Sequence, residues 1–185
     1  MSQTDLSLYN NHPYQPGAGW VKRTLWFYIN AIIFKSYLLP INQIKIFLLR
    51  AFGAKIGTGV VIKPNVNIKY PWHLTVDNNT WIGEGVWIDN LVMVTIGSNV
   101  CLSQGAILQT GNHNYKKSSF DLITGSIVLK DGVWVGCGAT VSAGVTAGSH
   151  SVLTTGSIAN KNLNEYFIYQ GNPAVAVRKR EIAAV

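Results

Sequence analysis

An aliphatic residue recurs at every sixth position through the central stretch of the chain, residues 56–159. A small or branched residue stands four positions after most of these aliphatic residues and therefore two positions before the next one. Residues two apart in an extended segment point to the same face, so a pair such as Val60 and Ile62 predicts a short strand with one inward face. The aliphatic positions are Ile56, Ile62, Ile68, Ile82, Ile88, Ile96, Leu102, Leu108, Leu129, Val135, Val141, Ala147, Leu153 and Ala159.

Glycine stands in the gaps between these pairs, as at Gly57 and Gly59. Only glycine turns that sharply without a Cβ clash, so we interpret the gaps as glycine corners between strands of about three residues. Such strands are too short for hairpins, but they can wind as parallel coils. An antiparallel sandwich would show turn signals every ~8–12 residues and no fixed phase. The pattern therefore predicts an all-β core folded as a parallel β-helix.

The six-residue phase breaks at three places. The intervals from Ile68 to Ile82 and from Ile82 to Ile96 each measure fourteen residues instead of twelve. We therefore expect two extra residues to bulge from a coil in each interval. The interval from Leu108 to Leu129 measures twenty-one residues and is largely polar, which predicts an ejected loop near residues 109–128. A solenoid needs no such loop for its own stability, and surface loops often carry functional residues. We therefore expect this loop to be functional.

These breaks and the flanking composition predict three parts, at residues 1–55, 56–161 and 162–185. The middle part is the β-helix with its ejected loop. The last part loses the repeat and carries Arg178-Lys179-Arg180, which predicts a C-terminal cap and a basic tail.

The N-terminal part divides further. Residues 1–19 contain Asn, Pro and Gly at intervals that forbid regular structure, so we expect an extended arm that either wraps a neighbour or stays loose. Apolar helical patterning predicts two helices, at residues 20–39 and 41–52.

These two helices carry more apolar surface than one buried face needs, and two explanations remain open. The helices cap the open first coil of the β-helix, whose strand edges would otherwise be bare. Alternatively, or in addition, they rest on a membrane surface, with anionic headgroups meeting Lys22, Arg23, Lys35, Lys45 and Arg50. The apolar run of residues 25–39 is too short and too interrupted to span a bilayer.

The chain carries a formal net charge of +7, but its basic residues are spread along the sequence. Diffuse basicity favours anionic small molecules or lipid headgroups over a nucleic-acid partner. The two cysteines, Cys101 and Cys137, show neither zinc-ligand nor disulfide spacing. The first residues do not resemble a signal peptide, so we expect a cytoplasmic protein.

Four histidines are candidates for a general base, because histidine most readily accepts a proton near neutral pH. His12 lies in the arm, His73 in the first bulge and His150 in a glycine-containing corner. His113 alone lies at the root of the ejected loop.

The segment from Ile96-Gly97-Ser98-Asn99-Val100 through Thr110-Gly111-Asn112-His113 resembles the hexapeptide-repeat sugar O-acetyltransferases. The resemblance implies a left-handed β-helix and assigns His113 as the base that deprotonates an acceptor hydroxyl for direct attack on acetyl-CoA. No acyl-enzyme and no metal are required, which agrees with the absence of a Gly-x-Ser-x-Gly motif. The residues Trp81 to Asn90 and Ser103 to Ala106 resemble the colanic acid or exopolysaccharide branch of this family.

The same resemblance implies the binding residues. Asp89 and Asn90 fall where relatives bind the acceptor, and the last coils look like the coenzyme A side of the family. The cofactor-binding residues that the resemblance implies are Trp134, Cys137, Thr155, Asn160, Lys161 and Arg178. It also implies a homotrimer, because the active sites of this family lie between neighbouring prisms.

Other functions were weighed against a sugar O-acetyltransferase. A nucleotide-sugar N-acetyltransferase would show the same donor site and base. A γ-type carbonic anhydrase shares the prism but needs three histidines on a metal, a spacing that His73, His113 and His150 do not show. A trimeric scaffold without activity is the alternative outside catalysis. We therefore expect an acetyl-CoA-dependent enzyme acting on a small-molecule or glycan acceptor.

Overall fold

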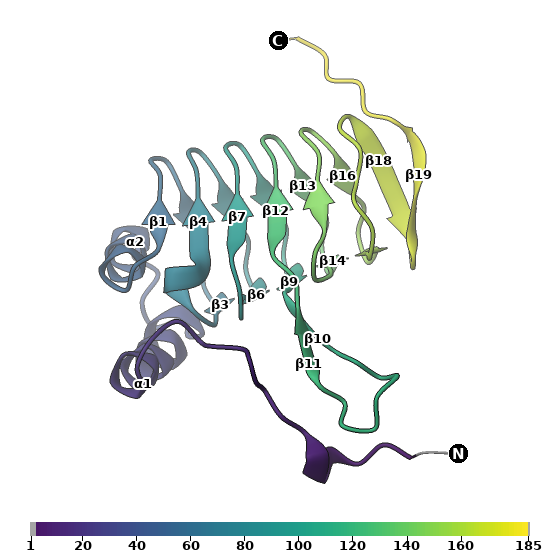
Figure 1. The fold of residues 1–185 in the computed structure, drawn as a ribbon. Coiled ribbons are helices and arrows are strands. Elements are labelled where there is room, and N and C mark those ends of the chain that lie inside the picture. The colour runs from purple at the N-terminus through teal and green to yellow at the C-terminus, as the bar shows by residue number, and fades with distance from the viewer. Residues whose placement is uncertain (1–2, 185) are drawn as a thin grey trace.

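The computed structural model describes residues 3–184, and its core is a three-sided prism of stacked coils. Each complete coil contributes one strand to each of three parallel sheets (Figure 1). The first sheet contains β1 (Lys55–Ile56), β4 (Leu74–Val76), β7 (Val94–Ile96), β12 (Ile127–Leu129) and β15 (Thr146–Ala147). The second contains β2 (Val61–Ile62), β5 (Trp81–Ile82), β8 (Cys101–Leu102), β13 (Trp134–Val135) and β16 (Val152–Leu153). The third contains β3 (Asn67–Ile68), β6 (Trp87–Asp89), β9 (Ile107–Gln109), β14 (Thr140–Val141) and β17 (Ile158–Ala159).

The predicted parallel β-helix is confirmed. Every predicted aliphatic position is at most 8% exposed, and its partners of the Val60 type line the same core. The outward positions beside them stay exposed, for example Trp81, which is 62% exposed. Burial of these inward rows, roughly 1.5–3 kcal/mol for each large aliphatic side chain, supplies the stability of the prism.

The first two corners of each coil are tight turns with one residue at positive φ. Between the first and second sheets these residues are Gly59, Asn79, Asn99, Gly132 and His150. Between the second and third sheets they are Asn65, Gly85, Gly105, Gly138 and Gly156. The expectation that only glycine forms these corners is therefore wrong, because asparagine also tolerates left-handed backbone. His150 has a φ of 58° and holds one such corner.

The third corner, from the third sheet back to the first, is irregular, and all three phase breaks lie there. The two fourteen-residue intervals each contain one eight-residue step, which ends at Val76 in the first interval and at Ile96 in the second. Strand pairing sets Ile56 opposite Val76 and Val76 opposite Ile96, so both residues are inward positions of the first sheet. The first break contains the 3₁₀ turn η3 (Pro71–His73). The ejected loop leaves the same corner and forms the antiparallel pair β10 (Gly111–His113) and β11 (Leu122–Thr124).

The N-terminal helices cover the open end of the first coil (Figure 1). They are α1 (Trp20–Ile29), continued by the π-helical turn η2 (Asn30–Phe34), and α2 (Asn42–Ala51). The helix predicted for residues 20–39 therefore ends at Phe34. The arm is not wholly extended either, because it contains the 3₁₀ turn η1 (Leu6–Leu8).

Side chains of these helices bond to the backbone of the first coil. Lys45 Nζ donates to the carbonyls of Ile62 and Lys63, at 3.4 and 3.0 Å. Arg50 Nη2 donates to Ile56 O at 2.7 Å, and the Trp26 indole donates to Ile68 O at 2.8 Å. Lys45 and Arg50 therefore bind the strand edge of the prism. Lys45 is buried, so its interpretation as a headgroup ligand is wrong, whereas Arg50 is exposed and its contact with headgroups stays a prediction.

At the opposite end, β18 (Phe167–Gly171) continues the second sheet after β16, and β19 (Ala174–Lys179) pairs with it antiparallel. This hairpin closes the last coil.

Candidate active site

The third corner gathers polar residues because equivalent positions of successive coils lie one above another. Strand pairing sets Asn67 opposite Trp87 and Asp89 opposite Gln109, so Lys69, Asp89 and Gln109 form one row along the corner. Asp89 lies at the end of β6, and Lys69 Nζ is 2.9 Å from its Oδ1. The side chain of Asp89 is 15% exposed, so this ion pair is partly shielded from solvent.

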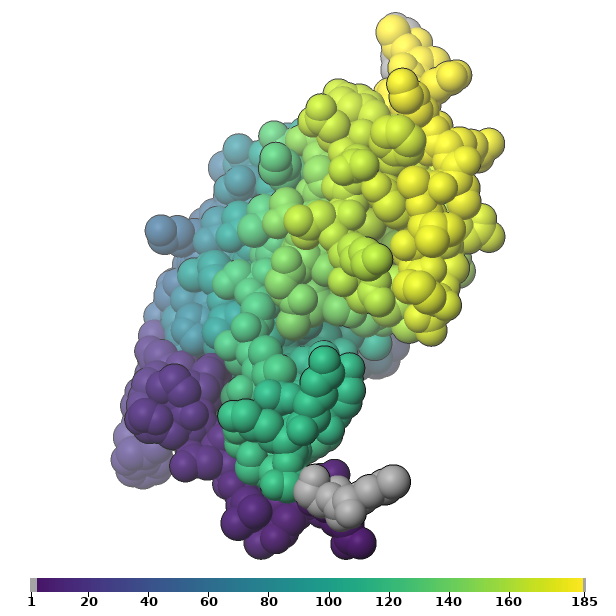
Figure 2. Space-filling model, turned by 45° about the vertical axis from the view of Figure 1, so that its right-hand side comes forward, coloured from purple at the N-terminus to yellow at the C-terminus, as the bar shows by residue number. Residues whose placement is uncertain are grey.

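The β10–β11 hairpin places His113 at the end of this row. His113 pairs in register with Leu122, and Asn114 N donates to Asp121 O at 2.8 Å, which closes the hairpin just beyond the histidine. In Figure 2 the loop stands out from the prism beside the N-terminal helices and arm.

The ring of His113 is held by one residue of the same loop. Its plane is stacked on Phe120 with centroids 4.5 Å apart, and its Nδ1 lies 3.0 Å from the carbonyl oxygen of Phe120. A carbonyl can only accept a hydrogen bond, so this contact requires the proton on Nδ1. In the neutral ring Nε2 then carries the free lone pair, so Nε2 is the nitrogen that can accept a proton when the histidine acts as a base.

The N-terminal arm lies on this corner of its own chain. Asp5 N donates to Ser118 O at 2.8 Å, and the ring of Tyr9 lies 5.7 Å from that of His113. Trp72 Nε1 donates to Pro16 O at 2.7 Å, which holds the other end of the arm. The arm therefore does not stay loose as one interpretation expected.

The arm, the hairpin and the corner row enclose a cavity of about 470 Å³ that contains both His113 and Asp89. Other side chains that line it are Tyr9, Tyr14, Arg23, Lys69, Tyr70 and Gln109. Tyr14 donates from its hydroxyl to Leu91 O at 3.2 Å, and burial, with Tyr70 and Asp89 nearby, raises its pKa well above 10. Tyr14 therefore stays a neutral hydroxyl at neutral pH.

Asn90 does not face this cavity. Its side chain is fully buried; its Nδ2 donates to the carbonyls of Tyr70 and His73 at 2.6 and 3.1 Å, and its Oδ1 accepts from Tyr70 N at 3.0 Å. These hydrogen bonds connect the second phase break, which contains Asn90, to the first, which contains Tyr70 and His73. The Asn90 side chain is therefore occupied by backbone contacts of this corner, and its expected role in acceptor binding stays a prediction.

The six residues expected to bind the cofactor lie toward the C-terminal end of the prism, and neither of the two described cavities includes them. Trp134 begins β13 and donates from its indole to Ser103 Oγ at 2.9 Å. Cys137 and Thr155 are exposed at equivalent positions of the second corner in successive coils. The other three are Asn160, Lys161 and Arg178, of which the first two follow β17 at the third corner and the last lies on β19. The structure thus brings Trp134, Cys137 and Thr155 to one edge and leaves the other three apart from it.

Several residues of the cavity were not expected from the sequence. Lys69, Tyr70, Tyr14 and Arg23 carry no motif of their own. Phe120, which contacts His113 but is not among the lining residues, carries none either. The twenty-residue step from Lys69 to Asp89 was a usable signal for Lys69, because that step equals one coil. The arm and helix residues had no such signal, since their approach to the corner depends on tertiary packing.

In residues 3–184 no three His, Cys, Asp or Glu side chains are grouped so that they could hold a metal ion. Within the same range no helix has the length and apolar character needed to cross a membrane.

A three-sided prism of parallel coils with an ejected polar loop is the architecture of a hexapeptide-repeat acetyltransferase. A Vibrio cholerae hexapeptide-repeat acetyltransferase has this fold, with a TM-score of 0.78, 22% identity, and coverage of 88% of this chain and 92% of that one. A maltose O-acetyltransferase from Clostridium difficile gives a TM-score of 0.75 at 20% identity, covering 88% of each chain. These likenesses confirm the predicted left-handed β-helix.

The sequence narrows the family. It is 37% identical over 164 residues to the colanic acid biosynthesis acetyltransferase WcaF of Escherichia coli, covering 89% of this chain and 90% of that protein. The chain therefore belongs to the WcaF branch of the hexapeptide-repeat acetyltransferases and is an acyltransferase, as predicted. No model of a known protein family matches the chain.

Proposed function

We propose that the protein transfers the acetyl group of acetyl-CoA to a sugar hydroxyl of an exopolysaccharide precursor, with His113 as general base. The observation that carries the proposal is the contact of His113 Nδ1 with Phe120 O, which leaves Nε2 as the free base nitrogen of a histidine that lines the same cavity as Asp89. Two comparisons support the substrates: WcaF is named for colanic acid biosynthesis, and the Vibrio cholerae neighbour has been crystallised with acetyl coenzyme A.

The reaction is a direct transfer. His113 Nε2 takes the proton of the acceptor hydroxyl while the hydroxyl oxygen attacks the thioester carbonyl. The new C–O bond forms, the C–S bond breaks, and the proton passes to the coenzyme A thiolate. The products are an acetyl ester and free coenzyme A.

Asp89 orients the acceptor in this proposal. Its carboxylate accepts hydrogen bonds only, so it suits a sugar that donates from neighbouring hydroxyls. Lys69 holds that carboxylate in place through the 2.9 Å ion pair.

The donor lies along the C-terminal coils in this proposal. The exposed edge formed by Trp134, Cys137 and Thr155 takes the pantetheine arm, with Asn160 beside it. Lys161 and Arg178 are both exposed and take the phosphates, for which their cationic side chains are suited.

We also propose that the protein is cytoplasmic and forms a homotrimer. The trimer would cover the outward tryptophans Trp81, Trp87 and Trp134, which are 62%, 43% and 45% exposed in a single chain. Light scattering should give about three times the chain mass of 20.2 kDa. A monomer at micromolar concentration contradicts this assembly.

Peripheral membrane contact is a further part of the proposal. The N-terminal helices and the segment between them expose large apolar side chains that line neither described cavity, among them Leu25, Ile32, Leu38 and Phe47. Residues 6–76 contain no aspartate or glutamate, so this end of the molecule is cationic. Both properties suit an anionic lipid surface.

The test of the catalytic proposal uses radiolabelled acetyl-CoA and exopolysaccharide precursors. The wild-type product should release its label with hydroxylamine, as an ester does, whereas the amide made by a nucleotide-sugar N-acetyltransferase should keep it. His113→Ala should lower transfer by ~10²–10⁴-fold. Full activity of a folded His113→Ala variant removes His113 from the mechanism.

A further inference from the structure

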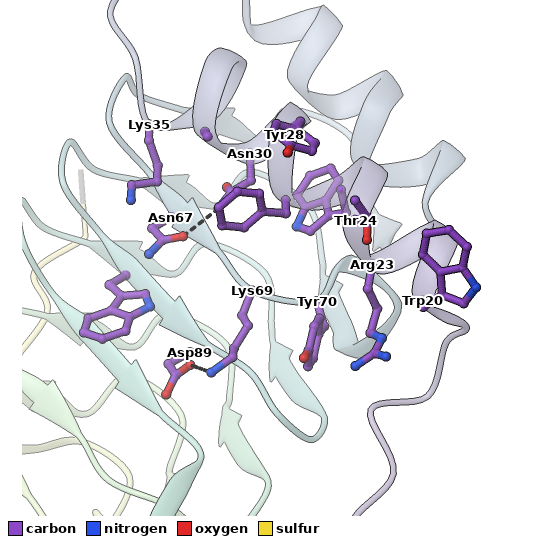
Figure 3. A pocket seen from close by; sticks show the side chains of 14 residues that line it. Trp20, Arg23, Thr24, Tyr28, Asn30, Lys35, Asn67, Lys69, Tyr70 and Asp89 are labelled. Carbon is purple, nitrogen blue, oxygen red and sulfur yellow. Dashed lines mark hydrogen bonds and ion pairs between the residues drawn. The ribbon is translucent and has the colours of Figure 1, made fainter.

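A second cavity of about 580 Å³ lies between α1 and the third corner, next to the His113 cavity. The two cavities share Arg23, Lys69, Tyr70 and Asp89 as wall residues, so they adjoin each other. Figure 3 shows Lys69 reaching Asp89 from below α1, while Arg23 extends from α1 beside Tyr70. A molecule that reacts at His113 can therefore extend past the Lys69–Asp89 pair toward α1.

The charge of this second cavity is positive. Arg23, Lys35 and Lys69 line it together with a single carboxylate, Asp89, which Lys69 pairs. Within residues 3–184 the ion pairs are Lys69–Asp89 and Lys117–Asp121, so Arg23 and Lys35 have no carboxylate partner there.

Arg23 supplies a second and independent sign of a missing ligand. Its Nε is buried, and none of the described residues accepts a hydrogen bond from it. An unpaired buried donor destabilises the protein, so an anion bound at this point would satisfy the guanidinium.

The walls of the cavity suit sugar rings. Trp20, Phe27 and Tyr28 line it from α1, and Trp87 lines it from β6. Trp20 is 72% exposed, so its face can receive a ligand. Aromatic faces pack against apolar ring faces, while the polar edges of a sugar remain free for hydrogen bonds.

We propose that this second cavity is an acceptor subsite for an anionic group, either a carboxylate or a phosphate. The anionic group is attached to the glycan beyond the sugar that is acetylated. Arg23, whose Nε is unpaired, binds the anion, and Lys35 adds positive charge from the opposite side of the cavity (Figure 3). The aromatic walls hold the connecting ring. The inference rests on the proposed function, because it extends the acceptor from the His113 cavity. It narrows the substrate class to acidic or phosphate-linked glycans.

Binding measured without acetyl-CoA separates this inference from catalysis. The probes are cellobiose, the same disaccharide with a terminal uronic acid, and glucose 1-phosphate, titrated by ligand-observed NMR at constant ionic strength. We expect at least one anionic probe to bind ~10-fold more tightly than cellobiose, the effect of one charge-assisted hydrogen bond. A preference for the uronic acid identifies a carboxylate, and a preference for glucose 1-phosphate identifies a phosphate.

Two double variants test whether the anionic probes bind in the second cavity. Arg23→Gln/Lys35→Gln should lose the preference, whereas Lys55→Gln/Lys63→Gln removes the same net charge outside both cavities and should keep it. Lys35→Gln alone, at an exposed position, should weaken the preference and serves as the second variant if the Arg23 change prevents folding. His113→Ala should keep the preference, so loss of transfer and loss of the subsite are separate results. Equal affinity for all three probes, or an equal loss in both double variants, overturns the proposal.

Discussion

The carbonyl oxygen of Phe120 lies 3.0 Å from Nδ1 of His113, and the phenyl ring of Phe120 is stacked on the imidazole at a centroid distance of 4.5 Å. One residue of the ejected loop thus sets both the tautomer and the plane of the proposed base. The backbone supplies the first effect and the side chain supplies the second. A substitution at this position can therefore separate them.

Phe120→Ala should lower kcat by ~10–100-fold and leave the KM for acetyl-CoA nearly unchanged, because the imidazole loses its stacking partner but keeps its carbonyl acceptor. Phe120→Tyr retains the ring and should retain activity. Steady-state kinetics of both variants test this positioning role. The matched control is Ile123→Ala, at an exposed residue of the same hairpin, and a comparable fall in its kcat contradicts a specific role for Phe120.

Lys45 provides a test of the N-terminal cap. Its side chain is fully buried, and burial lowers its pKa below the ordinary value of 10.5. The unfolded chain binds this proton more tightly than the folded one, so Lys45 makes stability rise with pH between the lowered pKa and 10.5. Below that window its carbonyl bonds persist at the cost of a buried charge.

Lys45→Met should therefore destabilise the protein by about 1–3 kcal/mol, because the carbonyls of Ile62 and Lys63 lose their donor. The wild-type advantage should grow as pH rises toward 10.5. Urea denaturation of both proteins between neutral and alkaline pH measures the difference. A gap that shrinks with rising pH contradicts the buried position of the charge, and Lys55→Met controls for the loss of an exposed lysine.

The core of the fold could be predicted from sequence because a β-helix repeats local geometry. Each inward residue, such as Leu102, meets its equivalents one coil away, so a periodic pattern contains the packing. The corners were less predictable, because asparagine replaces glycine at Asn79 and Asn99. The strand that contains Val76 was missed for a related reason, since an eight-residue step interrupts the six-residue phase.

The site was only partly predictable. His113 and Asp89 follow strands of the repeat, and the structure brings both into one cavity. Asn90 looked equivalent to Asp89 in sequence, but alternation along the chain turns it inward, where it binds the backbone of the preceding coil. The contributions of Arg23 and the arm depend on segments that lie far from the loop in sequence.

Cys137 tests the donor edge. It is exposed beside Gly138, whose φ is 62°, so a larger side chain at Cys137 projects outward and leaves the corner intact. Cys137→Trp should block the pantetheine path and raise the KM for acetyl-CoA by ~10-fold or more, about 1.4 kcal/mol of binding free energy. Cys137→Ser keeps a small side chain and should keep the KM. An unchanged KM in folded Cys137→Trp places the donor elsewhere.

The apolar surface of the N-terminal helices gives the last prediction. Leu25 and Ile32 are seven residues apart along α1 and η2, so they share a helix face, and they are 54% and 60% exposed. In a trimer, three such faces act together and multiply weak single contacts. We expect weak flotation with anionic vesicles and little with neutral vesicles. Flotation should fall as added salt shortens the screening length to ~8 Å at physiological ionic strength.

Leu25→Ser/Ile32→Ser should abolish this flotation. The control Val175→Ser/Val177→Ser changes two exposed residues at the opposite end of the prism and should float like the wild type. If the wild-type protein stays with the unbound fraction even at low salt, the helices serve only to cap the first coil through contacts such as that of Lys45 with Lys63 O.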